Sequence, residues 1–236
     1  MKSLEGKMKV VAVIPCYNEE KTIADIVTRT TKYVEKVVVA DDCSIDKTVD
    51  IALKAGATVV ANEIRQGFGG NMLSGISSAM TNGKPDIVVT LDGDGQHNPD
   101  EIPRVIEPIL KGQTDIVIGS RFMGDYDAPR YRKFGIDVIT WLYNVGNEQK
   151  ITDAQSCLRA YKREVLESVN LEEKGFGLST EILVKARAKG FRIVEVPVSC
   201  IYHKEFSMNS SMNPIKHGLS VALCTIKWRL RTRAQC

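Results

Sequence analysis

The stretch that decides the fold runs from Asp86 to Pro99 and reads DIVVTLDGDGQHNP. Residues 87–91 are apolar or β-branched, as expected of a strand that is buried on both faces of a parallel sheet. The residues that follow alternate aspartate with glycine, which is typical of a loop. Because ligands of open α/β sheets bind beyond the carboxyl ends of the strands, this junction is the first place to look for a site.

Short apolar runs alternate with amphipathic segments on both sides of this stretch. Strands are predicted at residues 9–14, 36–40, 58–61, 86–91, 115–118 and 192–198. Helices are predicted at residues 19–34, 46–55, from 67–70 onward, and at 100–110, 134–145 and 179–189. This alternation predicts an α/β fold with a mostly parallel sheet and helices on both faces. Pro197 favours an edge position for the last strand.

Length and composition favour one main domain. The chain has 236 residues, of which 43% are hydrophobic and 26% are charged, an ordinary balance for a globular α/β protein. Residues 1–212 are therefore taken as one domain, followed by a basic amphipathic helix or tail at 213–236. A net charge of +3 does not indicate a nucleic-acid binder, so no nucleic-acid partner is expected.

Cysteine use and hydropathy bear on the compartment. The six cysteines form no C-x-x-C pair, which argues against a zinc knuckle or a thioredoxin motif, and scattered cysteines fit a reducing compartment. The first nine residues lack an apolar signal core, and no stretch reaches the roughly 20 apolar residues that span a bilayer. We expect a cytoplasmic protein, either in solution or peripheral on the cytoplasmic membrane face.

Asp92 and Asp94 carry the strongest functional signal. In an extended segment, residues i and i+2 point to the same side, so these two carboxylates can converge. Carboxylates at close range repel unless a cation lies between them. Mg²⁺ and Mn²⁺ take such oxygen ligands and keep positions open for substrate phosphates, and Gln96 can add a neutral oxygen. The alternative is a solvated turn of aspartate and glycine.

Two further polar loops follow predicted strands. Residues 15–19 (PCYNE) offer a ring, Tyr17, and a carboxylate, Glu19, that can hold a nucleoside. Residues 41–46 (DDCSID) bring acidic side chains that suit a base N–H or a ribose hydroxyl and would repel a phosphate. Taken alone, each loop is also an ordinary turn into a capped helix.

Together these stretches resemble the family 2 glycosyltransferases, and within them the dolichyl-phosphate mannose synthases and related polyprenyl-phosphate hexose synthases. The resemblance covers most of residues 8–200 and implies the GT-A fold. The matching stretches are VVAVIPCYNEE (10–20), VVVADDCSIDKT (37–48), residues 62–75, VVTLDGDGQHNPDEIP (88–103), DIVIGSR (115–121), DAQSCLRAYKREVL (153–166) and GFRIVEVPV (190–198).

The resemblance implies a role for each matching residue. Contacts to the nucleotide are implied for Pro15, Tyr17, Asn18, Glu19, Asp41, Asp42 and Asp92, and the base contact is left open between Asp41 and Asp42. Asp92 and Asp94 would serve the metal and the diphosphate, helped by Gln96. Arg121 matches an arginine that faces phosphate. The acceptor side would include Asp153, Ser156 and Arg159. Cys43 and Cys157 stand where the family usually has glycine.

The implied reaction is an inverting transfer of a hexose from GDP-mannose or a UDP-hexose to a dolichyl or polyprenyl phosphate. A phosphate acceptor is already anionic and needs cations rather than a base. The candidates are Arg121, Arg130, Arg132 and Lys133, which as a group also fit a solvated basic loop. The alternative acceptor, a sugar hydroxyl of a polysaccharide or glycolipid, needs a general base. Glu181 is the candidate, although it equally fits an ordinary helix face.

Three other classes of protein fit the sequence less well. A nucleotidyltransferase would carry a glycine-rich basic loop after the first strand, where this chain has the acidic PCYNEE. An NAD-dependent oxidoreductase would carry G-x-G-x-x-G, and Gly67, Gly69 and Gly70 do not fit that spacing. A binding module with a degenerate site is disfavoured because both aspartates of the metal pair are present.

The C-terminal segment predicts a basic amphipathic helix. Asn213 can cap it and Pro214 suits its first position. Apolar residues recur at helical spacing at Ile215, Leu219, Ala222, Leu223, Ile226 and Leu230, and Trp228 suits a membrane interface. One hypothesis is that this helix lies on an anionic membrane surface near a lipid-linked acceptor. The other is that it packs on the enzyme's own core or in a homodimer.

Overall fold

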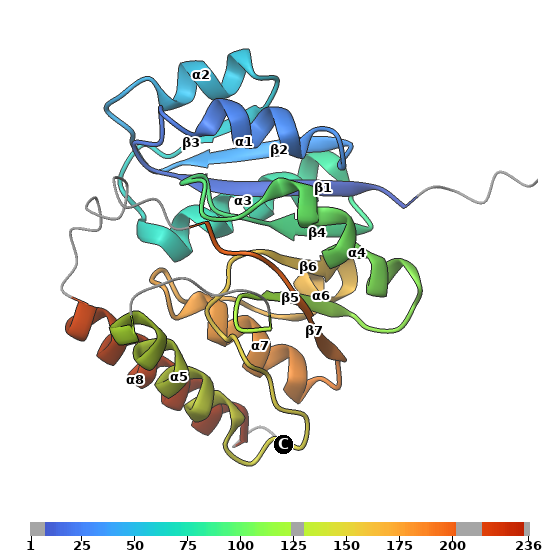
Figure 1. The fold of residues 1–236 in the computed structure, drawn as a ribbon, viewed down its shortest axis with the longest axis vertical. Coiled ribbons are helices and arrows are strands. Elements are labelled where there is room, and N and C mark those ends of the chain that lie inside the picture. Colours follow the sequence, from blue (N-terminus) through green and yellow to red (C-terminus); the bar gives the residue numbers. More distant parts are fainter. Residues whose placement is uncertain (1–7, 124–129, 202–213, 234–236) are drawn as a thin grey trace, which may run out of the picture.

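The computed structural model describes residues 8–123, 130–201 and 214–233 (Figure 1). A seven-stranded sheet runs through it in the order β3-β2-β1-β4-β6-β5-β7. The strands are β1 (Val10–Cys16), β2 (Lys36–Asp41), β3 (Thr58–Ala61), β4 (Ile87–Thr90), β5 (Ile116–Ser120), β6 (Arg159–Lys162) and β7 (Ile193–Pro197).

The sheet is mostly parallel, as predicted. β3, β2, β1 and β4 run parallel to one another, and β5 runs parallel to β7. β6 lies antiparallel between β4 and β5. The sequence analysis missed β6, because its four residues begin with arginine and end with lysine and show no apolar run. β7 is an edge strand, which confirms the position that Pro197 favours.

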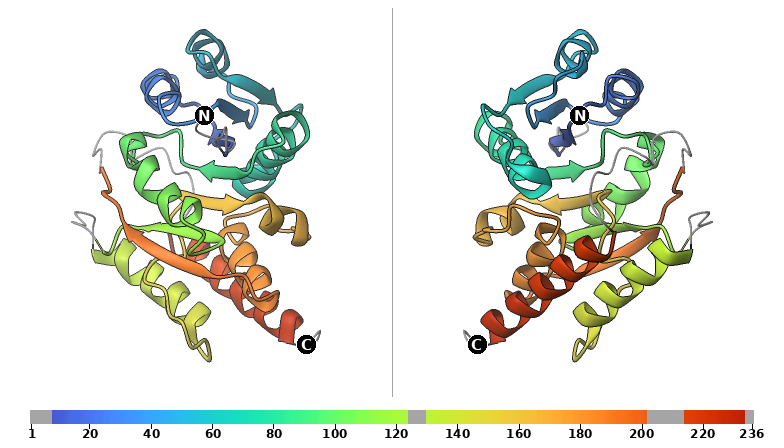
Figure 2. Two further views of the ribbon diagram at one scale, coloured as in Figure 1. Left: turned by 90° about the vertical axis from the view of Figure 1, so that its right-hand side faces the viewer. Right: turned by 90° about the vertical axis from the view of Figure 1, so that its left-hand side faces the viewer.

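Helices cover both faces of the sheet (Figure 2). They are α1 (Ile23–Thr30), α2 (Thr48–Lys54), α3 (Gly67–Gly83), α4 (Ile102–Leu110, after a 3-10 turn at Pro99–Glu101), α5 (Arg130–Asn144), α6 (Arg163–Ser168), α7 (Leu178–Ala188) and α8 (Pro214–Arg233). α6 was not predicted. Val10, Ala12 and Ile14 of β1 pack with α1 and α4, whereas Val11 and Val13 pack with α3. This alternation of buried side chains on both faces explains the continuous apolar runs of the central strands.

The C-terminal helix α8 packs against α5 and α7 (Figure 1). Its Val221, Thr225 and Trp228 are buried, so Trp228 is a core residue, which corrects its interpretation as a membrane-interface residue. Asn213, its predicted cap, lies outside the described residues. Within the parts of the chain that the structure describes, no helix is both long and apolar enough to cross a membrane.

Candidate active site

Three loops meet at the carboxyl ends of β1, β2 and β4. The backbone N–H of Asn18 donates to Ser44 Oγ at 2.9 Å, which joins the loop after β1 to the loop after β2. Thr22 Oγ1 donates to the carbonyl of Gly93 at 2.6 Å, which joins the first loop to the one after β4. The three polar motifs found in the sequence therefore lie together at the carboxyl ends of these strands, which we call the active-site edge.

The side chain of Asn71 on α3 fixes the ends of β1 and β2 by hydrogen bonds. Its side chain is buried, and Nδ2 donates to the carbonyls of Ala40 at 2.8 Å and Cys16 at 3.3 Å. Its Oδ1 accepts from Asn62 Nδ2 at 2.9 Å. Sequence reasoning did not single out Asn71, although a polar residue inside a glycine-rich, otherwise apolar helix start is a usable signal.

Glu19, Asp92 and Asp94 crowd this edge. Burial, and then the nearby Asp94, raise the pKa of Asp92 to about 7. Burial, followed by Asp94 and Asp92, raises the pKa of Glu19 to about 8. Carboxyl groups whose pKa values rise together in this way repel one another, and a divalent cation would relieve the repulsion. The donor set of hard oxygens fits Mg²⁺ or Mn²⁺.

Neighbouring side chains hold the two aspartates in place. The backbone N–H and Nε2 of Gln96 donate to Asp94 at 2.9 and 2.7 Å. Gln96 thus turns its amide nitrogen toward Asp94, and its role as an oxygen ligand stays a prediction. His97 is buried, which lowers its pKa to about 3, so its neutral Nδ1 accepts from the backbone N–H of Asp92. Among the described residues, no group of three or more His, Cys, Asp or Glu side chains is gathered to hold a metal alone.

Asp41 and Asp42 have different surroundings. The Asp42 carboxylate accepts from the backbone N–H groups of Gln66 at 2.6 Å and Gly67 at 3.0 Å, so it fixes the start of α3. Asp41 Oδ2 accepts from the backbone N–H of Ser44 at 2.9 Å. Asp41 Oδ1 is buried and meets no hydrogen-bond donor among the described residues. Of the two, Asp41 is the carboxylate with an oxygen left for a ligand.

The remaining residues of the first loop, Pro15, Tyr17 and Asn18, have different surroundings. Asn18 has a φ of +57°, and its Oδ1 accepts from the backbone N–H of Ile45 at 2.9 Å, so it links two loops. Pro15 lies inside β1. The Tyr17 ring is half-buried, and the guanidinium carbon of Arg65 lies 3.7 Å from its centroid. Tyr17 is the member of this loop that presents a flat surface at the edge of the site.

Cys43 has a φ of +64°, a conformation that favours glycine. This explains why the resembled family usually has glycine there, and it shows that the cysteine keeps the same backbone geometry.

Arg121 follows β5 and forms a salt bridge with Asp153. Its Nε and Nη2 donate to the two carboxylate oxygens at 2.7 and 2.9 Å. Asp153 is fully buried, which would raise its pKa, but the Arg121 guanidinium outweighs burial and the pKa is lowered. Lys133 Nζ, near the start of α5, lies 5.6 Å from the centroid of the Phe122 ring, so α5 begins beside Arg121. Arg130 and Arg132 also belong to α5, and their side chains lie outside the described part.

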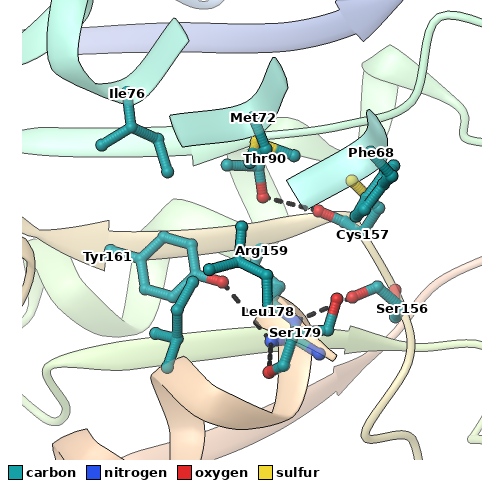
Figure 3. A pocket seen from close by; sticks show the side chains of 11 residues that line it. Phe68, Met72, Ile76, Thr90, Ser156, Cys157, Arg159, Tyr161, Leu178 and Ser179 are labelled. Carbon is teal, nitrogen blue, oxygen red and sulfur yellow. Dashed lines mark hydrogen bonds between the residues drawn. The ribbon is translucent and has the colours of Figure 1, made fainter. Parts of the chain in front are cut away.

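Arg159 is a structural residue, which corrects its expected contact with acceptor phosphate. It is 1% exposed and donates to the carbonyls of Ser156 and Ser179, both drawn in Figure 3, each at 2.7 Å. It also donates to the carbonyl of Ala154 at 2.7 Å. Ser156 is also fully buried. The cavity beside them has a volume of about 10 Å³, room for about one water molecule and too small for a sugar.

Glu181 is also structural, which corrects its expectation as a general base. Its carboxylate is fully buried and accepts from the backbone N–H groups of Glu172 and Glu173 at 3.0 and 2.9 Å. It also pairs with Lys185 Nζ at 2.6 Å. These contacts order the loop before α7 and leave the carboxylate no solvent-facing oxygen.

Comparison with known proteins identifies the family of this chain. The model of glycosyl transferase family 2 matches residues 11–169. The chain belongs to the family 2 glycosyltransferases. The sequence resemblance to this family is therefore confirmed, and the chain is a glycosyltransferase.

Several relatives of this family 2 glycosyltransferase carry names that specify a reaction, and two of them illustrate the class. The UDP-N-acetylglucosamine–dolichyl-phosphate N-acetylglucosaminyltransferase of Methanococcus voltae is 30% identical, over 86% of this chain and 90% of the relative. The undecaprenyl-phosphate mannosyltransferase of Micrococcus luteus is 31% identical, over 82% of this chain and 84% of the relative.

A solved structure supports the fold. Glucosyl-3-phosphoglycerate synthase of Mycobacterium tuberculosis, crystallised with Mn²⁺ and UDP-glucose, superimposes with a TM-score of 0.73 at 22% identity. The match covers 95% of this chain and 79% of the synthase. The family 2 chain thus has the GT-A fold that its sequence resemblance implies.

Proposed function

We propose that this glycosyltransferase moves a hexose, with inversion, from a nucleotide-diphosphate sugar (GDP-mannose or a UDP-hexose) to a dolichyl or other polyprenyl phosphate. The observation that carries the proposal is the crowding of Glu19, Asp92 and Asp94 at the edge of a site formed by three strand ends. The relatives that are named for dolichyl-phosphate and undecaprenyl-phosphate transfer support the acceptor class.

The donor would lie across the β1 and β2 ends. Asp41 Oδ1, which meets no donor among the described residues, would accept from a base N–H or a ribose hydroxyl. The Tyr17 ring would pack against the nucleoside. Asp42 is occupied by the backbone of α3, so we assign the base or ribose contact to Asp41.

Asp92 and Asp94 would hold Mg²⁺ or Mn²⁺ together with the donor diphosphate. A cation bound there would neutralise the negative charge that develops on the departing nucleoside diphosphate. Two carboxylates fit this arrangement because the diphosphate oxygens complete the coordination. The synthase with the same fold was crystallised with Mn²⁺ and UDP-glucose, although the proposal rests on the carboxylates of this chain.

The acceptor would be a phosphate rather than a hydroxyl. An acceptor phosphate oxygen forms the new bond to the anomeric carbon while the bond to the diphosphate oxygen breaks, and no proton has to be removed. This choice is favoured because Glu181, the predicted base for a hydroxyl acceptor, is fully buried and paired with Lys185. Arg121, held by Asp153, would position the acceptor phosphate.

We also propose that the enzyme attaches peripherally to an anionic membrane through α5 and α8. Each helix exposes an apolar stripe opposite its buried face: Phe134, Val138 and Trp141 on α5, continued by Val145 just after its end, and Leu219, Leu223, Ile226 and Leu230 on α8. The two helices contact each other, and together they contain eight Lys or Arg residues and one Asp. Such a combination suits an interfacial site, and it would bring a lipid-linked acceptor beside Arg121.

A donor and acceptor screen tests the reaction. Nucleotide sugars are tested for binding and for release of nucleoside diphosphate with Mg²⁺, Mn²⁺ or EDTA, with and without a short-chain polyprenyl phosphate. We expect one GDP- or UDP-hexose to be consumed only when metal and polyprenyl phosphate are both present. Transfer to a sugar hydroxyl, or transfer unaffected by EDTA, would contradict the proposal.

Vesicle flotation tests the attachment separately. We expect the chain to float with phosphatidylglycerol vesicles, and Trp141→Glu with Leu223→Glu to reduce the bound fraction at least about tenfold. Leu53→Glu, an exposed apolar position on α2, is the matched control and should float normally. A variant that floats as well as the parent chain, or one that changes from dimer to monomer, would contradict a lipid partner for these stripes.

A further inference from the structure

The loop before α7, residues 172–177 (EEKGFG), packs directly on the first turn of α3. The carbonyl of Lys174 accepts from the backbone N–H of Gly70 at 3.0 Å. A Cβ atom at Gly69 would collide with the carbonyl oxygen of Gly175, so a glycine is needed for the loop backbone to come this near to the helix. The loop and the start of α3 therefore have little freedom to shift independently.

The side chain of Glu173 joins the same loop to α8. Its Oε1 accepts from Lys227 Nζ at 2.5 Å and from Trp228 Nε1 at 3.2 Å. Burial would raise the pKa of Glu173, but the hydrogen bond and the charge of Lys227 outweigh burial and the pKa is lowered. At the end of the loop, a Cβ atom at Gly177 would collide with Cys224 Sγ, so α8 packs closely there as well.

The first turn of α3 in turn holds the donor side of the active-site edge. The backbone N–H groups of Gln66 and Gly67 donate to the Asp42 carboxylate at 2.6 and 3.0 Å. One turn further along, Asn71 donates to backbone carbonyls near the ends of β1 and β2. Asp41, whose Oδ1 is assigned to the nucleoside, directly precedes Asp42. A shift of the α3 start would therefore move the groups around the proposed nucleoside contact.

We propose that Glu173 is a positioning residue for the nucleotide, through which α8 holds the first turn of α3 against the donor side of the site. The inference rests on the proposed donor site, since it requires the nucleotide to lie at the β1 and β2 ends. The path has three steps. The Glu173 carboxylate binds α8, the loop backbone binds α3, and the N–H groups of α3 bind Asp42. Loosening the first step should therefore weaken binding of the donor.

The experiment measures nucleotide binding and amide hydrogen exchange in the full chain. UDP and GDP are titrated with Mn²⁺ present, and exchange is followed at residues 66–71 without nucleotide. We expect Glu173→Ala to raise the Kd of the nucleotide that the parent chain binds by about fivefold, because α3 is no longer held by α8. Exchange at residues 66–71 should become at least about threefold faster, whereas exchange in α4 should stay the same.

Two further variants separate positioning from a general loss of stability. Glu173→Gln keeps an oxygen that accepts from Trp228, so it should restore most of the affinity and of the slow exchange. Glu167→Ala removes an exposed acid on α6 and is the matched control, so it should behave as the parent chain.

The results distinguish this inference from the proposed function. If the parent chain binds a nucleotide and Glu173→Ala binds it equally well, the positioning role is overturned and the proposed function stands. The role is also overturned if exchange at residues 66–71 is unchanged, if exchange in α4 rises equally, or if Glu173→Gln restores nothing. If the parent chain binds neither UDP nor GDP, the proposed donor is wrong and the positioning role falls with it.

Discussion

The two halves of the sheet treat their buried acids differently. At the ends of β1 and β4, burial and then the nearby carboxylates raise the pKa values of Glu19, beside Asp94 and Asp92, and of Asp92, beside Asp94. In the half of the molecule built on β6, β5 and β7, Asp153 and Glu181 are fully buried, yet each is paired with a cation at 2.6 to 2.7 Å. Crowded acids store repulsion that a bound cation relieves, whereas paired acids hold the chain together. The first arrangement is therefore expected at a ligand site and the second in the framework around it.

The largest expected effect comes from removing a crowded acid. Asp94→Asn should lower metal-dependent transfer at least about a hundredfold, because it removes charge from the proposed metal site. Its free energy of unfolding should stay the same or rise, since one repulsive charge is gone. Turnover and urea unfolding are measured on the same preparation, with Glu107→Gln on α4 as the control. Undiminished transfer, or a clear loss of stability, would show that Asp94 is not a repelling carboxylate of a metal site.

Removing a paired acid should do the opposite. Glu181→Gln should lower the free energy of unfolding by about 2 kcal/mol, because it removes the charge nearest to Lys185 and leaves that ammonium with the more distant carboxylate of Glu172 at 3.5 Å. Transfer per folded molecule should stay within about threefold, as expected if no base is needed. Adding Lys185→Met should restore part of the stability, which separates loss of the pair from loss of the carboxylate. A collapse of turnover at unchanged stability would return Glu181 to catalysis.

The amino-acid sequence alone predicts part of this arrangement. Apolar runs and the loops after them were enough to find six of the seven strands and the three motifs that meet at the active-site edge. Sequence could not say which acid is crowded and which is paired, because that depends on partners far along the chain. Arg121 and Asp153 are 32 residues apart, and Asp42 reaches the backbone of Gln66. The role of Glu181 was left open between a general base and a helix-face residue, because its partners include backbone N–H groups, which no residue pattern reveals.

Asp41 and Asp42 test the comparison between adjacent residues. Asp41→Asn should raise the KM for the donor about tenfold with little change in stability, if Asp41 Oδ1 serves the nucleoside. Asp42→Asn should instead lower the free energy of unfolding by about 1 kcal/mol, because Asp42 holds the first N–H groups of α3. Donor KM and urea unfolding are measured for both variants. Identical behaviour of the two would show that the surroundings of each carboxylate do not decide its role.

The smallest expected effect lies at the far end of the sheet, where Asp115 precedes β5. Its carboxylate accepts from Lys162 Nζ at 2.8 Å and from Arg192 Nη2 at 3.1 Å, so it ties β6 and β7 to β5. Hydrogen bonding to Arg192 is the leading effect and lowers the pKa of Asp115 well below its ordinary value.

A carboxyl whose pKa is lower in the folded state stabilises the fold above its unfolded pKa of about 4 and loses that contribution as the pH falls further. Asp115→Asn should therefore cost about 1 kcal/mol at pH 7 and the same at pH 5. At pH 3 the gap between the parent chain and the variant should narrow, because the unfolded parent chain then takes up a proton that the folded one does not. Urea unfolding at the three pH values measures this gap. A gap that widens in acid would mean that Asp115 resembles the crowded acids of the active-site edge, and the division between the two halves would fail at its simplest case.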